Sequence, residues 1–251
     1  MARAFVLWLI WQNERTRQRY HIGNLEHLDG EYVFYYENRG KRRTLGEAMD
    51  VGYKPHLSFH NTERYYTSDV LFGPFARRLP DKRRPDYTAV LSGLGLTSDC
   101  TEMDLLRATG GRLATDSYEF VAPIYVHGNH FDFDFYVAGW RYNDGEKVLA
   151  NLNAGMNVYF KMEPLNMQDS EAVIVLSDKQ GHKIGYIPSF YSGFMSEVIR
   201  RNETYKAEVV SVHPIAEPQQ KVKISVEGHL QDIESIFFEE IPPLKVYNPV
   251  N

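Results

Sequence analysis

One short stretch of the sequence, residues 127–134, gathers residue types that bind metals. It holds two histidines and two aspartates within eight positions. If the stretch is a strand, alternation places His130, Asp132 and Asp134 on one face. Three such ligands could hold a divalent cation that activates water, the chemistry of a metal-dependent hydrolase. The phenylalanines between them equally fit an ordinary strand with its rings packed inward, and we expect that arrangement and no metal site.

Other reactive groups lack the neighbours that catalysis requires. Cys100 is the only cysteine, which excludes a disulfide framework and a multi-thiolate zinc site and favours a reducing, cytoplasmic setting. It stands at a predicted helix start, where a thiol pKa can be lowered, but the sequence places no partner beside it. The chain has no P-loop, nucleophile elbow or metalloprotease motif. We therefore expect a protein that is not an enzyme and holds no cofactor.

Composition limits the partners that the chain could bind. Its 251 residues are 43% hydrophobic and 24% charged, which fits one large or two modest globular domains. The longest apolar run, Ala4–Trp11, has eight residues and no cleavage site after it, so we expect neither a membrane span nor a signal peptide. Residues 1–120 carry a net charge of +1 and residues 121–251 carry −6. A protein that coats duplex DNA is usually basic, so any nucleic-acid site must be local.

The pattern of apolar residues predicts an α+β protein with two domains. Strands are predicted at Ala4–Trp11 and Tyr32–Tyr36, and helices at about 70–79, 87–94 and 101–109. After residue 120 the pattern changes to short strands, with one helix at about 189–201. This texture predicts a mixed α/β module (1–122), a mostly-β, OB-like small barrel with one or two helices (123–230) and a C-terminal tail (231–251). The predicted strands of the second half are 131–140, 156–162, 172–176, 183–187, 205–213 and 222–226.

Three linked blocks in the second half resemble the HIRAN domain. The blocks are Gly139–Tyr142 (GWRY), Glu163–Val173 (EPLNMQDSEAV) and Gly185–Pro188 (GYIP), and a predicted helix follows the last one. Their order and spacing agree with the family over about residues 131–230. The resemblance implies an oligonucleotide-binding-type barrel that captures the 3′ end of single-stranded DNA, as in DNA-repair ATPases of the SWI/SNF class.

The resemblance also implies roles for individual residues. Arg141 and Tyr142 match positions that contact the terminal nucleotide, Asn166 and Asp169 match the loop at the terminal sugar, and Tyr186 matches the pocket wall. An ionised Asp169 would accept a hydrogen bond from a free 3′-hydroxyl and repel the phosphodiester of an internal nucleotide. Tyr142 would stack on a base at about 1–3 kcal/mol, and Arg141 would contact phosphate. Alternatively, Asn166 and Asp169 only stabilise a turn through bonds to nearby backbone amides, and Tyr142 and Tyr186 only cover the hydrophobic core.

Two positions depart from the HIRAN pattern. Gln168 stands where many relatives have an aromatic residue, which removes a stacking surface. Ser189 stands where a basic residue often follows the third block, which removes a phosphate contact. We therefore expect weakened or altered DNA binding.

The first half resembles the N-terminal subdomain of HipA-type proteins over about residues 5–115. The resemblance lies in Gly23–Leu25, Tyr32–Tyr36, Phe75–Asp81 and Asp104–Gly111. The kinase core of that family is absent, because no phosphate-binding loop or metal-binding Asp-Asn set follows Gly111. The resemblance implies a module that positions or binds a partner.

Two basic clusters in this half are either a solvated face or a phosphate track that extends the barrel's site. The candidate track residues are Arg42, Arg43, Arg77, Arg78, Arg83 and Arg84. A contact with an acidic protein surface would look the same in sequence.

We therefore expect a non-catalytic protein that binds single-stranded DNA, preferentially at 3′ ends. It would be the recognition or adaptor component of a DNA-repair or defence system whose catalytic chain is separate. A protein-interaction module without DNA binding is the main alternative, and the metal-dependent hydrolase is the third.

Overall fold

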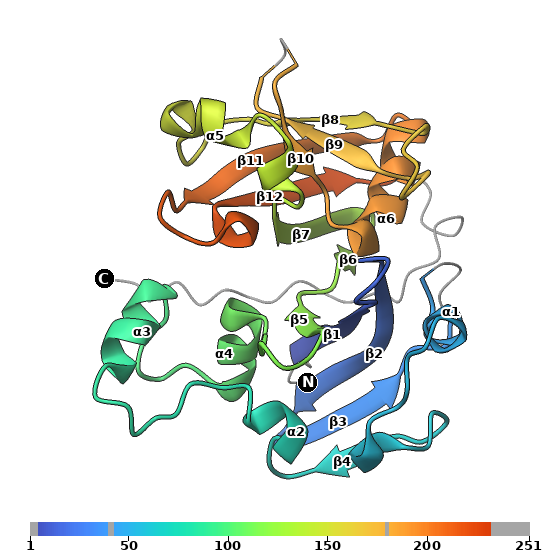
Figure 1. Ribbon diagram of the computed structural model, residues 1–251, viewed down its shortest axis with the longest axis vertical. Coiled ribbons are helices and arrows are strands. Elements are labelled where there is room, and N and C mark those ends of the chain that lie inside the picture. The colour runs from blue at the N-terminus through green and yellow to red at the C-terminus, as the bar shows by residue number, and fades with distance from the viewer. Residues whose placement is uncertain (1–4, 40–42, 179–180, 232–251) are drawn as a thin grey trace. The chain divides into compact units, whose positions relative to one another are not determined.

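A computed structural model describes residues 5–39, 43–178 and 181–231 (Figure 1). The chain divides between Pro123 and Ile124 into two compact units, called here the N-terminal and C-terminal units. Within the described ranges, no helix has the length and apolar character needed to cross a membrane. Arg42, and the predicted tail beyond Gln231, lie outside the described residues.

The N-terminal unit is built on a five-stranded antiparallel sheet of order β4-β3-β2-β1-β5. The strands are β1 (Phe5–Gln12), β2 (Arg19–Leu28), β3 (Glu31–Tyr36), β4 (Tyr66–Ser68) and β5 (Tyr118–Val121). The predicted strands correspond to β1 and β3. Strand β2 was not predicted, because His21, Asn24 and Glu26 interrupt its apolar pattern. Its pairing with β1 on one side and β3 on the other holds it in the extended conformation.

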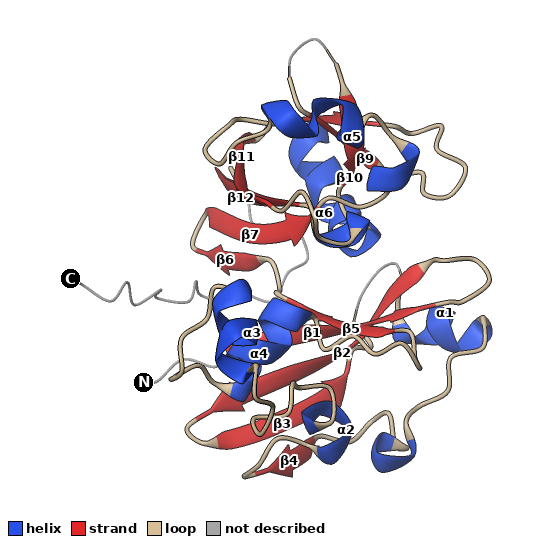
Figure 2. Ribbon diagram, turned by 60° about the vertical axis from the view of Figure 1, so that its left-hand side comes forward, coloured by secondary structure: helices blue, strands red, loops and turns tan. Residues whose placement is uncertain are grey.

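The short helices other than α3 contribute residues to the core of this sheet (Figure 2). The helices are α1 (Leu45–Asp50), η1 (Leu57–Phe59, a 3₁₀ turn), α2 (Gly73–Ala76), α3 (Tyr87–Gly93) and α4 (Glu102–Thr109). Alternating strand residues such as Leu7 and Leu9 belong to one core cluster with Phe75 of α2 and Met103 of α4. The predicted capping box forms at the start of α4, where Thr101 and Asp104 exchange hydrogen bonds. The predicted helix at 70–79 shortens to α2.

The C-terminal unit holds two open antiparallel sheets around one long helix. One sheet has the order β10-β9-β8 and the other β11-β12-β7-β6. The strands are β6 (Tyr125–His127), β7 (His130–Tyr136), β8 (Tyr159–Met162), β9 (Val173–Leu176), β10 (Lys183–Tyr186), β11 (Thr204–Val212) and β12 (Val222–His229). The helices are η2 (Trp140–Tyr142), α5 (Gly145–Val148), η3 (Leu149–Asn151), α6 (Ser189–Arg200) and η4 (Pro218–Gln220).

The aromatic side of β7 forms the core of this unit against α6. Phe131 and Phe133 contact Phe194, and Phe133 and Phe135 contact Tyr191, at centroid distances of 4.9–6.4 Å. The expected inward packing of the phenylalanines is therefore confirmed. A closed OB-like barrel is not confirmed, because the two sheets are open and single bridges, Ala138–Tyr186 and Asn157–Glu208, join them.

Candidate functional site

The GWRY block forms a turn that points one ring inward and one outward. Strand β7 ends at Tyr136, so the predicted strand to Trp140 is too long, and Gly139 (φ 70°) leads into η2. Trp140 is buried, and its Nε1 donates to Glu146 Oε1 at 2.8 Å. The Tyr142 side chain is 89% exposed. Arg141 lies beside it on the surface, 3.7 Å from Glu217. The turn therefore presents an aromatic ring and a guanidinium together.

Glycines bring this turn against Tyr186. Ala138 and Tyr186 exchange backbone hydrogen bonds of 2.8 and 2.9 Å. A Cβ on Gly185 would lie 2.3 Å from the Ala138 oxygen, and one on Gly139 would lie 3.3 Å from the Tyr186 ring. Only glycine at residue 185 permits this approach, so two of the three sequence blocks touch because of it.

A strand irregularity places Lys183 and Tyr186 together. Ordinary alternation would put residues 183 and 186 on opposite faces, but the register of β10 shifts between Lys183 and Gly185. The Lys183 ammonium consequently lies 4.1 Å from the centre of the Tyr186 ring and donates to its hydroxyl. Lys183 also pairs with Glu163 at 3.1 Å. The Tyr186 hydroxyl donates to the same carboxylate at 2.7 Å.

Glu163 is the centre of this network. The hydrogen bond from Asn166, followed by those from Tyr186 and Lys183, lowers the pKa of its carboxyl below the ordinary value. Burial works against the charge of Lys183, but its bonds to Tyr186 and Glu163 prevail and raise the pKa of the ammonium. The two groups therefore hold opposite charges at neutral pH and fix the Tyr186 ring in position.

Asn166 ties this network to the loop that follows β8. Its Nδ2 donates to Glu163 Oε2 at 2.7 Å and to the Tyr186 hydroxyl at 3.2 Å. Its Oδ1 accepts from the backbone N–H groups of Gln168 and Asp169. Asn166 is thus a turn former, as one sequence interpretation held, and it also joins the second and third sequence blocks.

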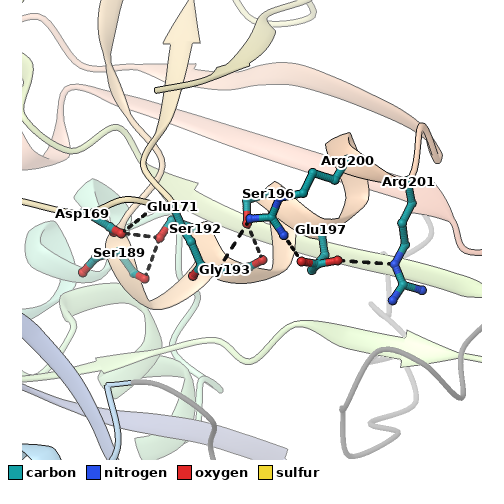
Figure 3. Close-up of polar contacts among 9 residues, drawn as sticks. All are labelled: Asp169, Glu171, Ser189, Ser192, Gly193, Ser196, Glu197, Arg200 and Arg201. Carbon is teal, nitrogen blue, oxygen red and sulfur yellow. Dashed lines mark hydrogen bonds and ion pairs between the residues drawn. The ribbon is translucent and has the colours of Figure 1, made fainter. Parts of the chain in front are cut away.

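Asp169 fastens the same loop to helix α6 (Figure 3). Its Oδ1 accepts from the Glu171 N–H at 2.9 Å, and its Oδ2 accepts from the Ser192 hydroxyl at 3.0 Å. Ser192 also lies 2.9 Å from the Ser189 oxygen at the first turn of α6. At the other end of this helix, Arg200 approaches Glu171 at 3.8 Å. The loop is therefore fixed to α6 at two points.

The tip of the loop projects from this frame. Leu165 and Met167 are 92% and 100% exposed, although the residues on either side of them are held by the contacts above. Gln168 is also exposed and donates its N–H to Asn166. The tip of the loop therefore presents apolar side chains to solvent.

The candidate metal strand does not gather its ligands. His130, Asp132 and Asp134 share the outward face, as expected, but successive residues on one face of a strand stand about 7 Å apart. Asp134 is instead paired with Lys223 at 2.8 Å, and the His130 ring packs 5.1 Å from that of His229. In the described parts of the chain, no three His, Cys, Asp or Glu side chains are placed to hold a metal ion.

The environment of Cys100 also differs from the expectation. Burial, the largest influence, raises the pKa of its thiol, whereas a helix start would lower it.

The basic residues of the predicted phosphate track have different environments. Arg78 is 7% exposed, pairs with Asp116 and donates to the Gly111 oxygen, so it presents no charge to a phosphate. Arg83 and Arg84 pair with neighbouring aspartates at 2.9 and 2.8 Å on the surface. Arg43 lies over the Tyr20 ring. Arg77 donates to the Gly73 oxygen.

Sequence reasoning missed the residues that hold the site together. Glu163, Lys183 and Ser192 were given no role, yet they position Tyr186, Asn166 and Asp169. Gly185 was the available signal, because a glycine inside a strand often marks a bulge or a close backbone approach. Neither the shifted register nor the contact of the loop with α6 could be read from residue spacing.

Comparison with known proteins identifies the C-terminal unit. The family model of the HIRAN domain matches residues 130–231, which supports a HIRAN domain in this segment. A crystal structure of a protein from Lactobacillus plantarum is similar at 24% identity, covering 38% of this chain and 92% of that chain, with a TM-score of 0.32. The crystal structure of the HIRAN domain of human HLTF is similar at 16% identity, covering 40% and 78%, with a TM-score of 0.29. No curated protein matches. The resemblance of residues 5–115 to the HipA subdomain stays a prediction.

Proposed function

We propose that the HIRAN domain of this protein binds single-stranded DNA, preferentially at a 3′ end, on the surface around Tyr142 and Tyr186. The family match supports this, since the HIRAN resemblance implies capture of such ends. The observation that carries the proposal is the exposed ring of Tyr142. A large aromatic side chain that is 89% exposed on a turn held by Gly139 and Trp140 is suited to stacking on a base.

Each side chain of the surface has a distinct task in this proposal. Tyr142 stacks on the terminal base, a contact of about 1–3 kcal/mol that does not depend on sequence. Arg141 exchanges its surface pair with Glu217 for a phosphate. Asp169, held at α6, repels the phosphate that an internal nucleotide would bring to its position. Tyr186 forms the wall of the pocket.

In this proposal the protein recognises DNA without catalysis, as the adaptor component of a DNA-repair or defence system with a separate catalytic chain. The sequence supports this, because it lacks the motifs of the common hydrolases and kinases. A second function, docking of a protein partner, is favoured by one observation. Leu165 and Met167 place exposed aliphatic side chains on the loop of the same surface.

Fluorescence anisotropy with a 5′-labelled oligothymidylate tests the DNA-binding proposal. We expect the full-length protein to bind the free 3′-hydroxyl form more tightly than the 3′-phosphorylated form. Tyr142→Ala should weaken binding about 5- to 150-fold, the equivalent of the stacking energy. Tyr65→Ala is the matched control, because Tyr65 is also an exposed tyrosine but belongs to the N-terminal unit. Equal affinity for both ends would exclude end recognition, and no binding to either would favour the protein-docking function.

A further inference from the structure

The N-terminal unit contains an open pocket that the proposed DNA interface does not use. The pocket has a volume of about 320 Å³ and lies beside β4, and we call it the β4 pocket. Its walls combine the aromatic rings of Phe59, Tyr66 and Phe72, the aliphatic hydroxyls of Ser58 and Thr67, and the guanidinium of Arg64. This mixture suits a ligand with an apolar part and a negative group.

The charge of the β4 pocket is positive. The Arg64 guanidinium lies 5.3 Å from the centre of the Tyr66 ring. Across the described residues, no ion pair involves Arg64. Arg77 donates to the oxygen of the wall residue Gly73 but does not itself line the pocket, so Arg64 is the charged wall residue. No wall residue is acidic. A carboxylate is therefore the electrostatically complementary group.

Exposed apolar residues are sequence neighbours of the pocket walls. Leu57, Tyr65 and Val70 are the three most exposed large hydrophobic residues of the described N-terminal unit. Leu57 precedes the wall residue Ser58, Tyr65 stands between Arg64 and Tyr66, and Val70 lies between β4 and Phe72. The Tyr65 ring stacks on that of Tyr35 at 4.8 Å, so Leu57 and Val70 are the exposed apolar residues next to the pocket walls, and such residues mark an interaction site for apolar side chains. They offer little to a polyanion, which requires a row of cations.

Strand β4 supplies the remaining element of a peptide site. It stands at the edge of the five-stranded sheet, with β3 on its other side. Two of its three residues, Tyr66 and Thr67, line the pocket. An extended peptide that pairs with a sheet edge directs alternate side chains to one face. A peptide paired with β4 could therefore place a side chain in the pocket.

We propose that the β4 pocket binds an extended segment of a partner polypeptide in which an acidic residue lies close to an aliphatic or aromatic one. The acidic side chain pairs with Arg64, the apolar one packs on the rings of Tyr66 and Phe72, and the peptide backbone extends the sheet at β4. This site gives the N-terminal unit a partner of its own, and it does not depend on DNA binding by the HIRAN domain.

The proposal is tested by selecting phage-displayed random 12-residue peptides for binding to the immobilised full-length protein. We expect enrichment of sequences with Asp or Glu within three positions of an apolar residue. A synthetic peptide of this kind should bind the Arg64→Glu variant at least tenfold more weakly. Arg83→Glu is the matched charge reversal at an exposed arginine outside the pocket and should change affinity less than twofold. A peptide with Lys in place of the acid should recover affinity for Arg64→Glu.

Three results would overturn the inference. They are the enrichment of peptides without acidic residues, the absence of any enriched sequence, and equal affinity of the selected peptide for wild type and Arg64→Glu. Competition by a 12-nucleotide oligothymidylate for the selected peptide would also overturn it, because the pocket would then be a nucleic-acid site. Tyr142→Ala should leave peptide affinity unchanged, so failure of the DNA proposal is distinguishable from failure of this one.

Discussion

Replacement of Asp169 by Asn separates its charge from its hydrogen bonds. Asn has the same shape, its Oδ1 can still accept from the Glu171 N–H, and its Nδ2 can donate to the Ser192 hydroxyl, which then donates to the Ser189 oxygen. We therefore expect Asp169→Asn to change the free energy of unfolding by no more than about 1 kcal/mol, or roughly 2–4 °C in Tm. The frame of the loop should persist.

The same change should remove most of the preference for a free 3′ end. A carboxylate and a phosphate separated by about 5 Å repel each other by about 1 kcal/mol in water and about 3 kcal/mol at an effective dielectric constant of 20. This repulsion corresponds to a preference of about 5- to 150-fold. Anisotropy titrations with 3′-hydroxyl and 3′-phosphate oligothymidylates measure it directly. For Asp169→Asn we expect a ratio below about twofold.

Ser192→Ala is the matched control, because it removes the hydrogen bond from α6 to Asp169 but keeps the carboxylate. It should lower stability by about 1 kcal/mol and retain the end preference. The opposite pattern, in which Asp169→Asn keeps the preference and Ser192→Ala loses it, would show that loop position and not charge distinguishes the end. The electrostatic reasoning would then be refuted.

Three further predictions concern stability. Hydrogen bonds from Asn166 and its neighbours lower the pKa of Glu163, so its contribution to the free energy of unfolding should be complete above about pH 4.5 and lost as the pH falls below that value. Between pH 7 and pH 3, the Tm of Glu163→Gln should therefore fall less than that of the wild type. Gly145→Ala should destabilise by about 1–3 kcal/mol in urea unfolding, since its Cβ would lie 2.5 Å from the Trp140 ring. Arg78→Met should destabilise by about 3 kcal/mol, because the Asp116 carboxylate then loses its partner.

Two control substitutions test the reasons for the last two predictions. Gly93→Ala places a Cβ in open space in α3 and should stabilise by about 0.5–1 kcal/mol, in contrast to Gly145→Ala. Arg83→Met removes an exposed guanidinium and should leave Tm unchanged, in contrast to Arg78→Met. Destabilisation by Gly93→Ala would contradict the explanation by the Trp140 clash, and destabilisation by Arg83→Met would contradict the explanation by the lost pair with Asp116.

Elements with regular apolar spacing were predictable from the sequence. The capping box at Thr101 predicts the start of α4, and the alternation of residues in β7 predicts its buried aromatic face. Each pattern depends only on residues a few positions apart. Strand β2 was not predicted from apolar spacing, since its polar residues obscure the alternation. Its extension depends on pairing with both neighbours, which is a tertiary effect.

The candidate site was predictable in its residues and not in its geometry. The three blocks do meet at Tyr186: Ala138, next to the first block, pairs with it, and Asn166 and Glu163 of the second block bond to its hydroxyl. The change from strand to 3₁₀ turn before Tyr142 was not foreseen, because Gly139 turns the chain where Ala138 pairs with Tyr186, a contact distant in sequence. Likewise, the register shift in β10 that brings Lys183 to Tyr186 has no periodic signature.

The cations near the candidate interface are compensated by the chain itself, and this limits how the interface can bind DNA. The pairs are Arg141 with Glu217, Lys183 with Glu163 and Lys221 with Glu146. A strand that binds here therefore gains little from counterion release, and neutralisation of one phosphate by Arg141 would give a salt slope of only about −0.7. Stacking on Tyr142 and the fit of a terminal sugar must then provide most of the affinity. Both require a flexible, unpaired end, so a domain with a net negative charge can still select single-stranded ends over duplex.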